Sequence, residues 1–303
     1  MKIAVIDLGT NTFNLVIASV TGKHIELLHN AKIGVALGKG GMSEKILTPE
    51  AIDRAVAAFD TFDPIWKSFE VEKVIGIGTS AIRSASNGVA FMNSLAEKYG
   101  IEMTIIDGQQ EAALIFQGVT WTTNIESPSL IMDIGGGSTE FIAVSNNEIT
   151  KACSLDIGLL RPTQLFQLEN PLTKQNCSDI LRWFEAQSEQ LQAFPKADVL
   201  IGASGSFETF YEMIYEQPFP KTMTAVPLSL EELLPQIDWL IASSQEERTQ
   251  HNWIIPIRQQ LAPIAALKLK WIIEKMNISS VLISPCSLKE GVLRVLNEGN
   301  KIS

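Results

Sequence analysis

Apolar residues along the chain form two similar patterns, one near the start and one near the middle. Lys2–Asp7 and Leu130–Asp133 are short apolar runs that each end in an aspartate. A glycine-containing turn follows each run, and then a second stretch rich in β-branched and aromatic residues, Phe13–Val20 and Glu140–Ser145. Partly alternating apolar positions around a tight turn predict a β-hairpin in each place.

The two patterns are copies at a constant separation. Asp7 and Asp133 lie 126 residues apart (133 − 7), and the glycine-bearing runs that contain Gly76 and Gly202 are separated equally (202 − 76). Motifs that keep one separation over about 70 residues indicate an internal duplication. We therefore expect two α/β units, each built as strand, tight turn, two strands, helix and strand.

Helical periodicity follows the first hairpin and dominates the second half. Thr48-Pro49-Glu50 is typical of a helix start, because it offers a capping hydroxyl, a proline for the first helical position and an acid for the first turn. Apolar residues follow it at helical spacing. Further helices are predicted to open near Gly108 and to cover Lys174–Ala193, Ser229–Ser243, Pro256–Met276 and Leu288–Leu296.

A polar segment, Trp121–Ser129, separates the two copies and contains Pro128. The chain has 303 residues, which suggests two domains at ~150 residues each. We predict domains over residues 1–123 and 124–303, with a final helix that can pack back on the first domain.

Composition and charge exclude several classes of protein. Hydrophobic residues make up 46% and charged residues 19%, so the chain is neither disordered nor of low complexity. The formal net charge is −10, from 24 basic and 34 acidic side chains, and we expect no general binding to nucleic acid or to an anionic membrane. A small polyanion held locally with metal ions is compatible with this charge. Apolar surface on the second-half helices could support a homodimer.

The cysteines indicate a reducing compartment. Cys153, Cys177 and Cys286 are far apart and odd in number, which argues against structural disulfides and thiolate zinc sites. Asp7 interrupts the first apolar run, so the start does not resemble a secretory signal. No run approaches about 18 uncharged apolar residues. We expect a cytoplasmic protein.

The two glycine turns could bind phosphate and metal. Successive backbone N–H groups of such a turn can converge on phosphate oxygens, and an adjacent carboxylate can hold Mg²⁺ directly or through water. A single glycine hairpin is more often only a tight turn. Two related copies, together with the small hydroxyl residues of Gly78-Thr79-Ser80 and Ser204-Gly205-Ser206, favour a ligand site at a domain interface.

Motifs along nearly the whole chain resemble those of the exopolyphosphatase/guanosine pentaphosphate phosphohydrolase (Ppx/GppA) family, in its short two-domain form. The segments that carry the resemblance are Asp7-Leu8-Gly9-Thr10-Asn11-Thr12, Gly78-Thr79-Ser80-Ala81-Ile82-Arg83-Ser84-Ala85-Ser86-Asn87, Gly108-Gln109-Gln110-Glu111-Ala112, Asp133-Ile134-Gly135-Gly136-Gly137-Ser138-Thr139-Glu140 and Ala203-Ser204-Gly205-Ser206. The resemblance implies an α/β fold of two duplicated ribonuclease-H-like (actin-like ATPase) domains with a cleft between them.

Carboxylates are the catalytic and metal-binding candidates. The resemblance implies that Glu111 is the catalytic glutamate and that Asp133 binds metal, with Asp7 as its duplicate. Glu140 could bind the metal or assist the attacking water, and its duplicate is Asn14 (140 − 14 = 126), so only the second copy carries this acid. The alternatives are an acid that favours the first turn of a helix and aspartates that cap turns.

Arg83 is the natural phosphate partner, because its guanidinium is a planar fork with permanent charge. Its alternative role is a salt bridge, for example to Glu111. Further contacts to the substrate phosphates are expected from Gly9, Thr10, Asn11, Thr79, Gly136, Gly137, Ser138, Gly205 and Ser206.

The resemblance implies a Mg²⁺-dependent (or other divalent cation-dependent) hydrolase of phosphoanhydride bonds. It would release terminal orthophosphate from a small polyanionic substrate, either inorganic polyphosphate or guanosine pentaphosphate or both, the latter pointing to the stringent response. Two other functions fit the same superfamily, because fold does not determine function. One is a small-molecule phosphotransferase, and the other is a sensor that binds guanosine polyphosphates without turnover.

Overall fold

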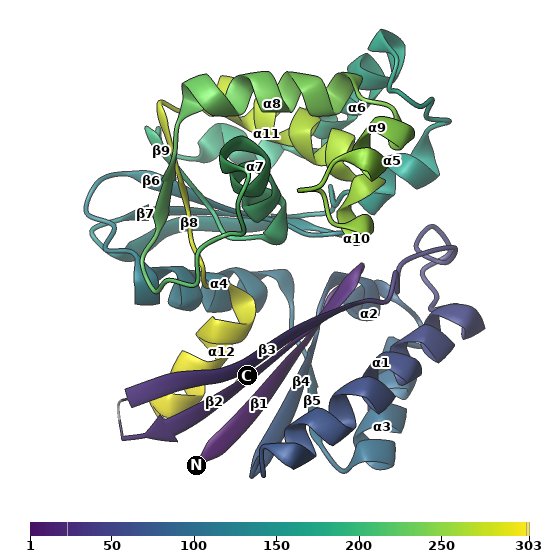
Figure 1. Cartoon of the computed structure of the whole chain (residues 1–303), viewed down its shortest axis with the longest axis vertical. Helices are drawn as coiled ribbons and strands as arrows, with labels where there is room; N and C mark the ends of the chain where they lie inside the picture. Colours follow the sequence, from purple (N-terminus) through teal and green to yellow (C-terminus); the bar gives the residue numbers. More distant parts are fainter. Residues whose placement is uncertain (23, 301, 303) are drawn as a thin grey trace. The chain divides into compact units, whose positions relative to one another are not determined.

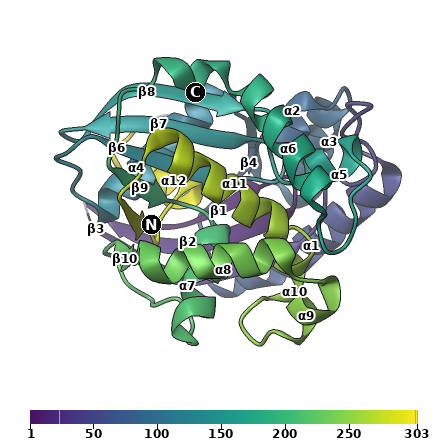
Figure 2. The same cartoon turned by 90° about the horizontal axis from the view of Figure 1, so that it is seen from above.

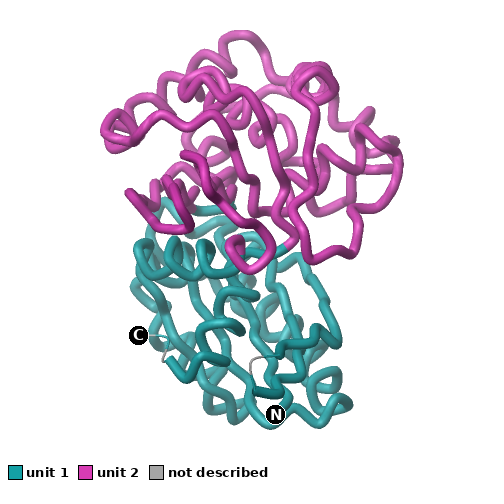
Figure 3. The backbone as a smooth tube through the Cα atoms, turned by 90° about the vertical axis from the view of Figure 1, so that its left-hand side faces the viewer, with its two compact units in different colours: residues 1–118, 135–137, 286–303 teal, residues 119–134, 138–285 magenta. Residues whose placement is uncertain are grey.

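The chain folds into two compact units (Figure 3). Each unit contains one sheet. The computed structural model describes residues 1–22, 24–300 and 302. Unit 1 contains Met1–Gly118, Gly135–Gly137 and Cys286–Ser303, and unit 2 contains Val119–Ile134 and Ser138–Pro285. The predicted boundary between residues 123 and 124 stays a prediction.

Within the described residues, unit 1 holds a five-stranded sheet in the order β3-β2-β1-β4-β5. β2 pairs antiparallel with β1 and β3, whereas β4 pairs parallel with β1 and β5. The bounds are β1 Lys2–Leu8, β2 Thr12–Thr21, β3 His24–Gly34, β4 Lys73–Gly78 and β5 Glu102–Ile105.

Helices cover both faces of the first sheet. In Figure 1, α1 and α3 lie on one face and α12, in yellow, lies against β1 and β2 on the other. The Thr48 hydroxyl accepts a hydrogen bond from the Ala51 N–H and Pro49 occupies the first turn of α1, as predicted. The bounds are α1 Pro49–Ser68, α2 Ser80–Ser84, α3 Gly88–Tyr99, α4 Gly108–Thr122 and α12 Leu288–Asn297.

Unit 2 has a six-stranded sheet in its described part, in the order β10-β11-β9-β6-β7-β8. The parallel strands β6, β9 and β11 form its centre, and the antiparallel pairs lie at its two edges. The bounds are β6 Ser129–Ile134, β7 Thr139–Ser145, β8 Glu148–Leu155, β9 Val199–Gly202, β10 Val226–Leu228 and β11 Ser280–Ile283.

A large apolar core joins this sheet to the helices of unit 2, with α8 and α11 side by side (Figure 2). Phe184, Phe207 and Phe210 are fully buried in that core. The helices are α5 Leu160–Leu165, α6 Lys174–Gln187, the 3-10 helix Glu189–Ala193, α7 Gly205–Tyr215, α8 Leu230–Ala242, α9 Gln245–Gln250, α10 Pro256–Gln259 and α11 Ala262–Met276.

The register of the two hairpins confirms the duplication. Asp7 is the cross-strand partner of Asn14 in the β1–β2 pair, and Asp133 is the partner of Glu140 in the β6–β7 pair. Both positions of the second pair are 126 residues beyond those of the first (133 − 7 and 140 − 14). The predicted α/β fold is therefore correct for both halves.

Two helices expected to be continuous are interrupted. The segment predicted as Lys174–Ala193 breaks at Ser188, whose hydroxyl donates to the Glu185 carbonyl where α6 ends. The segment predicted as Pro256–Met276 breaks before Pro263, which occupies the first turn of α11. A proline has no N–H to continue the hydrogen-bond ladder, so it begins a new helix more readily than it extends one.

Two glycines allow α4 and α12 to cross at backbone distance. A Cβ atom on Gly118 would lie 2.0 Å from the Ser287 carbonyl oxygen, and one on Gly291 would lie 1.8 Å from that of Leu114. No larger residue fits at either position without separating the helices. In the part of the chain that the structure describes, no helix combines the length and apolar character needed to cross a membrane.

Candidate active site

The first glycine turn connects β1 to β2. Its Gly9 N–H donates to the Thr12 carbonyl at 3.1 Å, which closes the turn. A Cβ atom on Gly9 would lie 2.8 Å from that carbonyl oxygen, so the turn requires glycine. The Asn11 carbonyl accepts from Val35 and Ala36 and is held by the segment after β3. The turn is thus fixed from both sides, and the Gly9 N–H is already used within it.

The second glycine turn packs on the first. Gly135–Gly137 group with unit 1, and a Cβ atom on Gly136 would lie within 3.4 Å of atoms of Thr10 and Asn11. A Cβ atom on Gly137 would lie 2.6 Å from Ser80 Oγ and 2.7 Å from Thr10 Oγ1. Two hydroxyls therefore meet the backbone of the second turn.

Ser80 is a residue that the candidate set omitted. It is 3% exposed, and its Oγ has no hydrogen-bond partner among the described residues. A buried hydroxyl of this kind is unfavourable unless it forms a hydrogen bond with a ligand or a water molecule. Its neighbour Thr79 is different, because the Thr79 hydroxyl donates to the Leu8 carbonyl at 3.3 Å and ties α2 to the end of β1.

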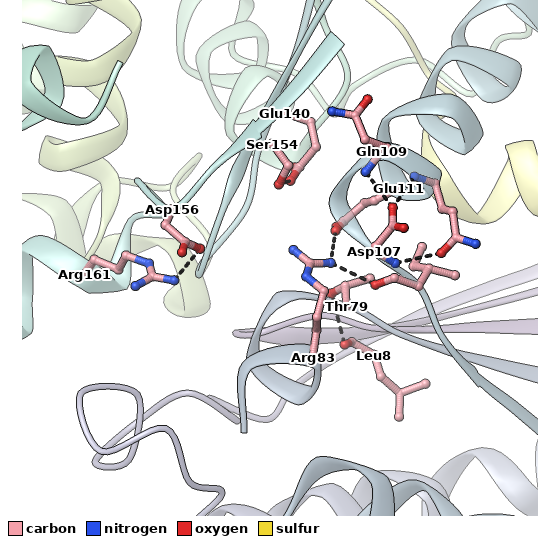
Figure 4. A network of polar contacts seen from close by, with 12 residues as sticks. Leu8, Thr79, Arg83, Asp107, Gln109, Glu111, Glu140, Ser154, Asp156 and Arg161 are labelled. Atoms are coloured by element: carbon pink, nitrogen blue, oxygen red, sulfur yellow. Dashed lines mark hydrogen bonds and ion pairs between the residues drawn. The ribbon is translucent and has the colours of Figure 1, made fainter. Parts of the chain in front are cut away.

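Arg83 and Glu111 form an ion pair in unit 1. Arg83 Nη1 lies 2.8 Å from Glu111 Oε2 and also donates to the Ile106 carbonyl at 3.0 Å (Figure 4). Glu111 is 7% exposed, in the first turn of α4. The salt bridge weighed as the alternative role of Arg83 thus exists. A phosphate group would compete with Glu111 for the same guanidinium.

Asp7 is held as half of an acid–amide pair. Asn14 Nδ2 donates to Asp7 Oδ2 at 3.0 Å. Burial raises the pKa of Asp7 to about 6, although the Asn14 hydrogen bond and the charge of Lys289 lower it. The Glu290 carboxylate on α12 raises the Asp7 pKa further. The predicted metal-binding role of Asp7 stays a prediction.

Asp133 and Glu140 form an acid–acid pair in unit 2. They are direct cross-strand neighbours on β6 and β7, which places both side chains on the same face of the sheet. Ser154 on β8 donates its hydroxyl to Glu140 Oε1 at 2.7 Å (Figure 4). Glu140 is 2% exposed, whereas Asp133 is half-buried. No group of three or more His, Cys, Asp or Glu side chains in the described residues forms a metal site.

The second small-residue motif opens α7. Ser204 precedes the helix and its Oγ accepts the Ile134 N–H at 3.3 Å, so β6 and α7 meet there. Gly205 and Ser206 are half-buried in the first turn of α7. The guanidinium of Arg258 lies on Gly205, where a Cβ atom would be 2.2 Å from Nη2.

Arg258 and Lys268 are two further residues that the candidate set omitted. Arg258 donates to Glu208 Oε2 at 2.6 Å and to Thr209 Oγ1 at 2.7 Å, both on α7. Lys268 is completely buried on α11. A sequence signal exists for Lys268 alone, since it occupies an apolar position of a helical repeat (Leu261, Ala265, Lys268, Ile272).

The candidates thus gather in two sets. Unit 1 holds Asp7, Gly9, Thr10, Asn11, Thr79, Arg83, Glu111, Gly136 and Gly137, and unit 2 holds Asp133, Ser138, Glu140, Gly205 and Ser206. Each set contains carboxylates together with glycine or small hydroxyl residues.

Solved structures of other proteins match this chain over nearly its full length. The crystal structure of an exopolyphosphatase from Cytophaga hutchinsonii superimposes with a TM-score of 0.94 and 33% identity, covering 100% of both chains. An exopolyphosphatase-like protein matches with a TM-score of 0.91 and 23% identity over 98% of each chain. The Aquifex aeolicus member of the Ppx/GppA family matches with a TM-score of 0.82 and 22% identity over 99% of each chain. The model of the Ppx/GppA phosphatase family matches residues 16–297. This chain belongs to the Ppx/GppA phosphatase family and has its two-domain, actin-like fold.

Proposed function

We propose that the protein is a divalent-cation-dependent phosphohydrolase that removes the terminal phosphoryl group from inorganic polyphosphate, guanosine pentaphosphate or both. The observation that carries the proposal is the acid pair Asp133–Glu140 beside a glycine turn. Its duplicate, Asp7–Asn14, is an ordinary acid–amide hydrogen bond. A turn kept only for structure has no need of the second acid.

The acid pair fits Mg²⁺. Like charges directly opposite on two strands destabilise a sheet unless a cation offsets them. Mg²⁺ takes oxygen ligands and is commonly held by one or two carboxylates, with water and substrate phosphates completing its shell. Asp133 and Glu140 would hold the ion, with Ser154 orienting the Glu140 carboxylate. Bound there, Mg²⁺ would neutralise phosphate charge and act as a Lewis acid.

In this proposal Arg83 binds the phosphate and Glu111 accepts the proton of the attacking water. A phosphate oxygen that binds Arg83 replaces one partner of the Arg83–Glu111 ion pair and releases the Glu111 carboxylate. Glu111 then orients a water for in-line attack and accepts its proton. A new P–O bond forms to the water oxygen, the anhydride P–O bond breaks, and the shortened chain leaves as the anion.

Phosphate oxygens would be held by the turns. Ser80 Oγ, which lacks a partner among the described residues, can donate to one of them. The Ser138 backbone, just before β7, and the N-terminal turn of α7 with Gly205 and Ser206 would offer N–H donors. With a net charge of −10, such local donors and a metal ion must supply the attraction for a polyanion.

Substrate and compartment are part of the proposal. A chain 33% identical over its full length is described as an exopolyphosphatase, which favours polyphosphate. Among the described residues, Cys153, Cys177 and Cys286 form no disulfide. This agrees with our proposal that the protein works in the reducing cytoplasm. A homodimer remains a prediction.

Phosphate release from medium-chain polyphosphate, guanosine pentaphosphate and ATP, with Mg²⁺ and with chelator, tests the function. We expect release from at least one of the first two, loss of it in chelator, and a fall of about 100-fold or more in Glu111→Gln. Glu50→Gln is the matched control, because Glu50 also lies in the first turn of a helix, α1, and is exposed. Tight binding of guanosine polyphosphates without release would contradict the hydrolase and support the sensor.

A further inference from the structure

Lys268 is completely buried in the core of unit 2. It lies in the middle of α11 and is 0% exposed. Lysine is almost never fully buried unless its amine is paired, because removing a charge from water is costly. Burial lowers the pKa of Lys268 well below its usual value, and the Glu140 carboxylate opposes this shift. The free-energy cost of burying this amine indicates that Lys268 has a specific role.

The Lys268 amine is satisfied on three sides. Nζ donates to Thr139 Oγ1 at 2.7 Å and to the Ile157 carbonyl. It also lies 5.0 Å from the centroid of the Phe184 ring, which can face a cation. The contacts come from β7, from the segment after β8, and from α6. One side chain thus connects parts of unit 2 that are more than 100 residues away from it in sequence, at separations of 129 and 111 residues.

Both hydrogen bonds are made at the same end of the β7–β8 hairpin. Thr139 pairs across the sheet with Leu155, and Ile157 follows Leu155 by two residues. Thr139 is the first residue of β7 and stands between Ser138 and Glu140. Lys268 therefore clamps the end of the hairpin from which the glycine turn and the Glu140 side chain emerge.

An apolar residue would serve the core as well. A methionine of similar length fills the same volume without the cost of burying a charge, although it leaves the Thr139 hydroxyl and the Ile157 carbonyl without the lysine donor. Core packing alone therefore does not explain a lysine here, whereas hydrogen bonding to Thr139 and Ile157 requires an N–H donor of this length.

We propose that Lys268 is a positioning residue for the hydrolytic reaction: through Thr139 and Ile157 it fixes the backbone that presents Ser138 and Glu140. The proposal rests on the proposed function of that hairpin. Lys268 touches neither substrate nor metal in this role. Its removal displaces the Glu140 carboxylate and leaves the rest of the unit folded.

Lys268→Met tests the proposal, with Lys270→Met as the matched control. Lys270 is on the same helix, and its amine pairs with Asp238 at 2.7 Å at the surface. We expect Lys268→Met to lower kcat by about 10- to 100-fold with KM within about twofold, since small displacements of a reacting group cost this much. The melting temperature should change little, because relief of the buried charge offsets the loss of the donor to Thr139 and Ile157. Lys270→Met should behave as wild type. A purely structural lysine would give the opposite result: a lower melting temperature with unchanged kcat.

Thr139→Val removes the acceptor of the Lys268–Thr139 hydrogen bond instead of its donor. It also tests the proposal if Lys268→Met does not fold. It removes the acceptor hydroxyl with almost no change of shape. We expect the same loss of kcat, and no additional loss in the double variant, because the two residues act as one unit. Additive losses in the double variant, or wild-type kcat in Thr139→Val, would overturn the proposal.

Hydrogen exchange of the backbone amides of residues 138–141, without substrate or metal, separates this proposal from the proposed function. We expect exchange there to be about 10-fold faster or more in Lys268→Met and unchanged in Lys270→Met. Unchanged exchange in Lys268→Met overturns the positioning role whatever the activity. Faster exchange in a protein whose wild type hydrolyses no substrate supports the positioning role and shows that the assigned reaction is wrong.

Discussion

Asp133 and Glu140 face each other directly across β6 and β7, at the positions where the first half of the chain has Asp7 and Asn14. The same hairpin thus exists twice in one molecule, once with an acid–amide pair and once with two acids. Because Glu140 stands where the first hairpin has Asn14, the first hairpin is an internal reference for the proposed metal site.

Glu140→Gln should convert the second pair into a copy of the first. We expect an intact fold, loss of Mg²⁺-dependent activity, and loss of stabilisation by Mg²⁺. A ligand at 100 times its Kd stabilises the folded state by about 2.7 kcal/mol. The measurement is the melting temperature with Mg²⁺ and with chelator, which should differ in wild type and coincide in the variant. A Mg²⁺-dependent shift that survives in Glu140→Gln would contradict the assignment.

Asn14→Asp is the reciprocal control, because it places a second acid opposite Asp7. We expect it to destabilise unit 1 near neutral pH, where both carboxylates repel, and to leave the Mg²⁺-dependent shift of wild type unchanged.

Asp7 should make the protein less stable as pH rises. Burial raises its pKa in the folded state to about 6 from the ordinary aspartate value of 3.8, so the folded state holds the proton more tightly than the unfolded chain. Below pH 3.8 the Asp7 carboxyl is protonated in both the folded and the unfolded state, so it does not change the stability. The free energy of unfolding falls as pH rises from about 4 to about 6. Above pH 6 the loss of stability caused by the buried Asp7 carboxylate is complete. The penalty is about 2–3 kcal/mol.

Asp7→Asn removes this penalty, because an amide does not ionise and still accepts from Asn14. In urea unfolding with chelator, we expect the variant to be more stable than wild type at pH 7.5 and nearly equal at pH 4. Parallel stability curves for the two proteins between these pH values would show that Asp7 has an ordinary pKa.

Arg83→Lys separates a phosphate contact from a structural salt bridge. Lysine retains the charge but not the planar fork that binds the Ile106 carbonyl together with either Glu111 or a phosphate oxygen. If Arg83 contacts the reacting phosphate, kcat/KM falls by about 100-fold, as for loss of one donor to a developing charge. Arg182→Lys, on an exposed ion pair of α6, should have no effect. Loss of stability with unchanged kcat/KM would mean that the salt bridge is the whole role of Arg83.

Ser80→Ala should stabilise the protein while weakening substrate binding. The variant removes a buried hydroxyl that has no partner among the described residues, which relieves a desolvation cost of about 1 kcal/mol. It also removes a donor for phosphate, so KM should rise about 10-fold. Thr123→Val is the control, because Thr123 Oγ1 is buried and equally unpartnered among those residues but is outside the candidate set. An unchanged KM in Ser80→Ala would exclude the contact.

The duplicated framework could be predicted from sequence because it depends on local chemistry. The glycine turns, the capped start of α1 at Thr48, and the 126-residue separation of Asp7 and Asp133 follow from residue types at fixed spacings. The helix break before Pro263 could also have been predicted, since proline marks a helix start more often than an interior.

The electrostatics of the site could not be predicted, because they depend on contacts far apart in sequence. The Arg83–Glu111 pair joins residues 28 positions apart, and the Lys268–Thr139 bond spans 129. Sequence spacing left a phosphate contact and a salt bridge as alternatives for Arg83, and only the fold shows that the ion pair is made. The hydroxyl of Ser80, which has no partner among the described residues, lies beside the backbone of Gly137, and no local pattern encodes this proximity.

The position of α12 has a consequence for synthesis. Residues 286–303 belong to unit 1, where α12 packs on β1 and β2 and crosses α4 through Gly118 and Gly291. Domains generally fold in order as the ribosome makes them. Here the second face of the first sheet is covered only once Leu288–Asn297 has been made, and β11 (Ser280–Ile283), a central strand of the second sheet, is made just before it. Both units therefore complete their cores only when residues 280–297 are available.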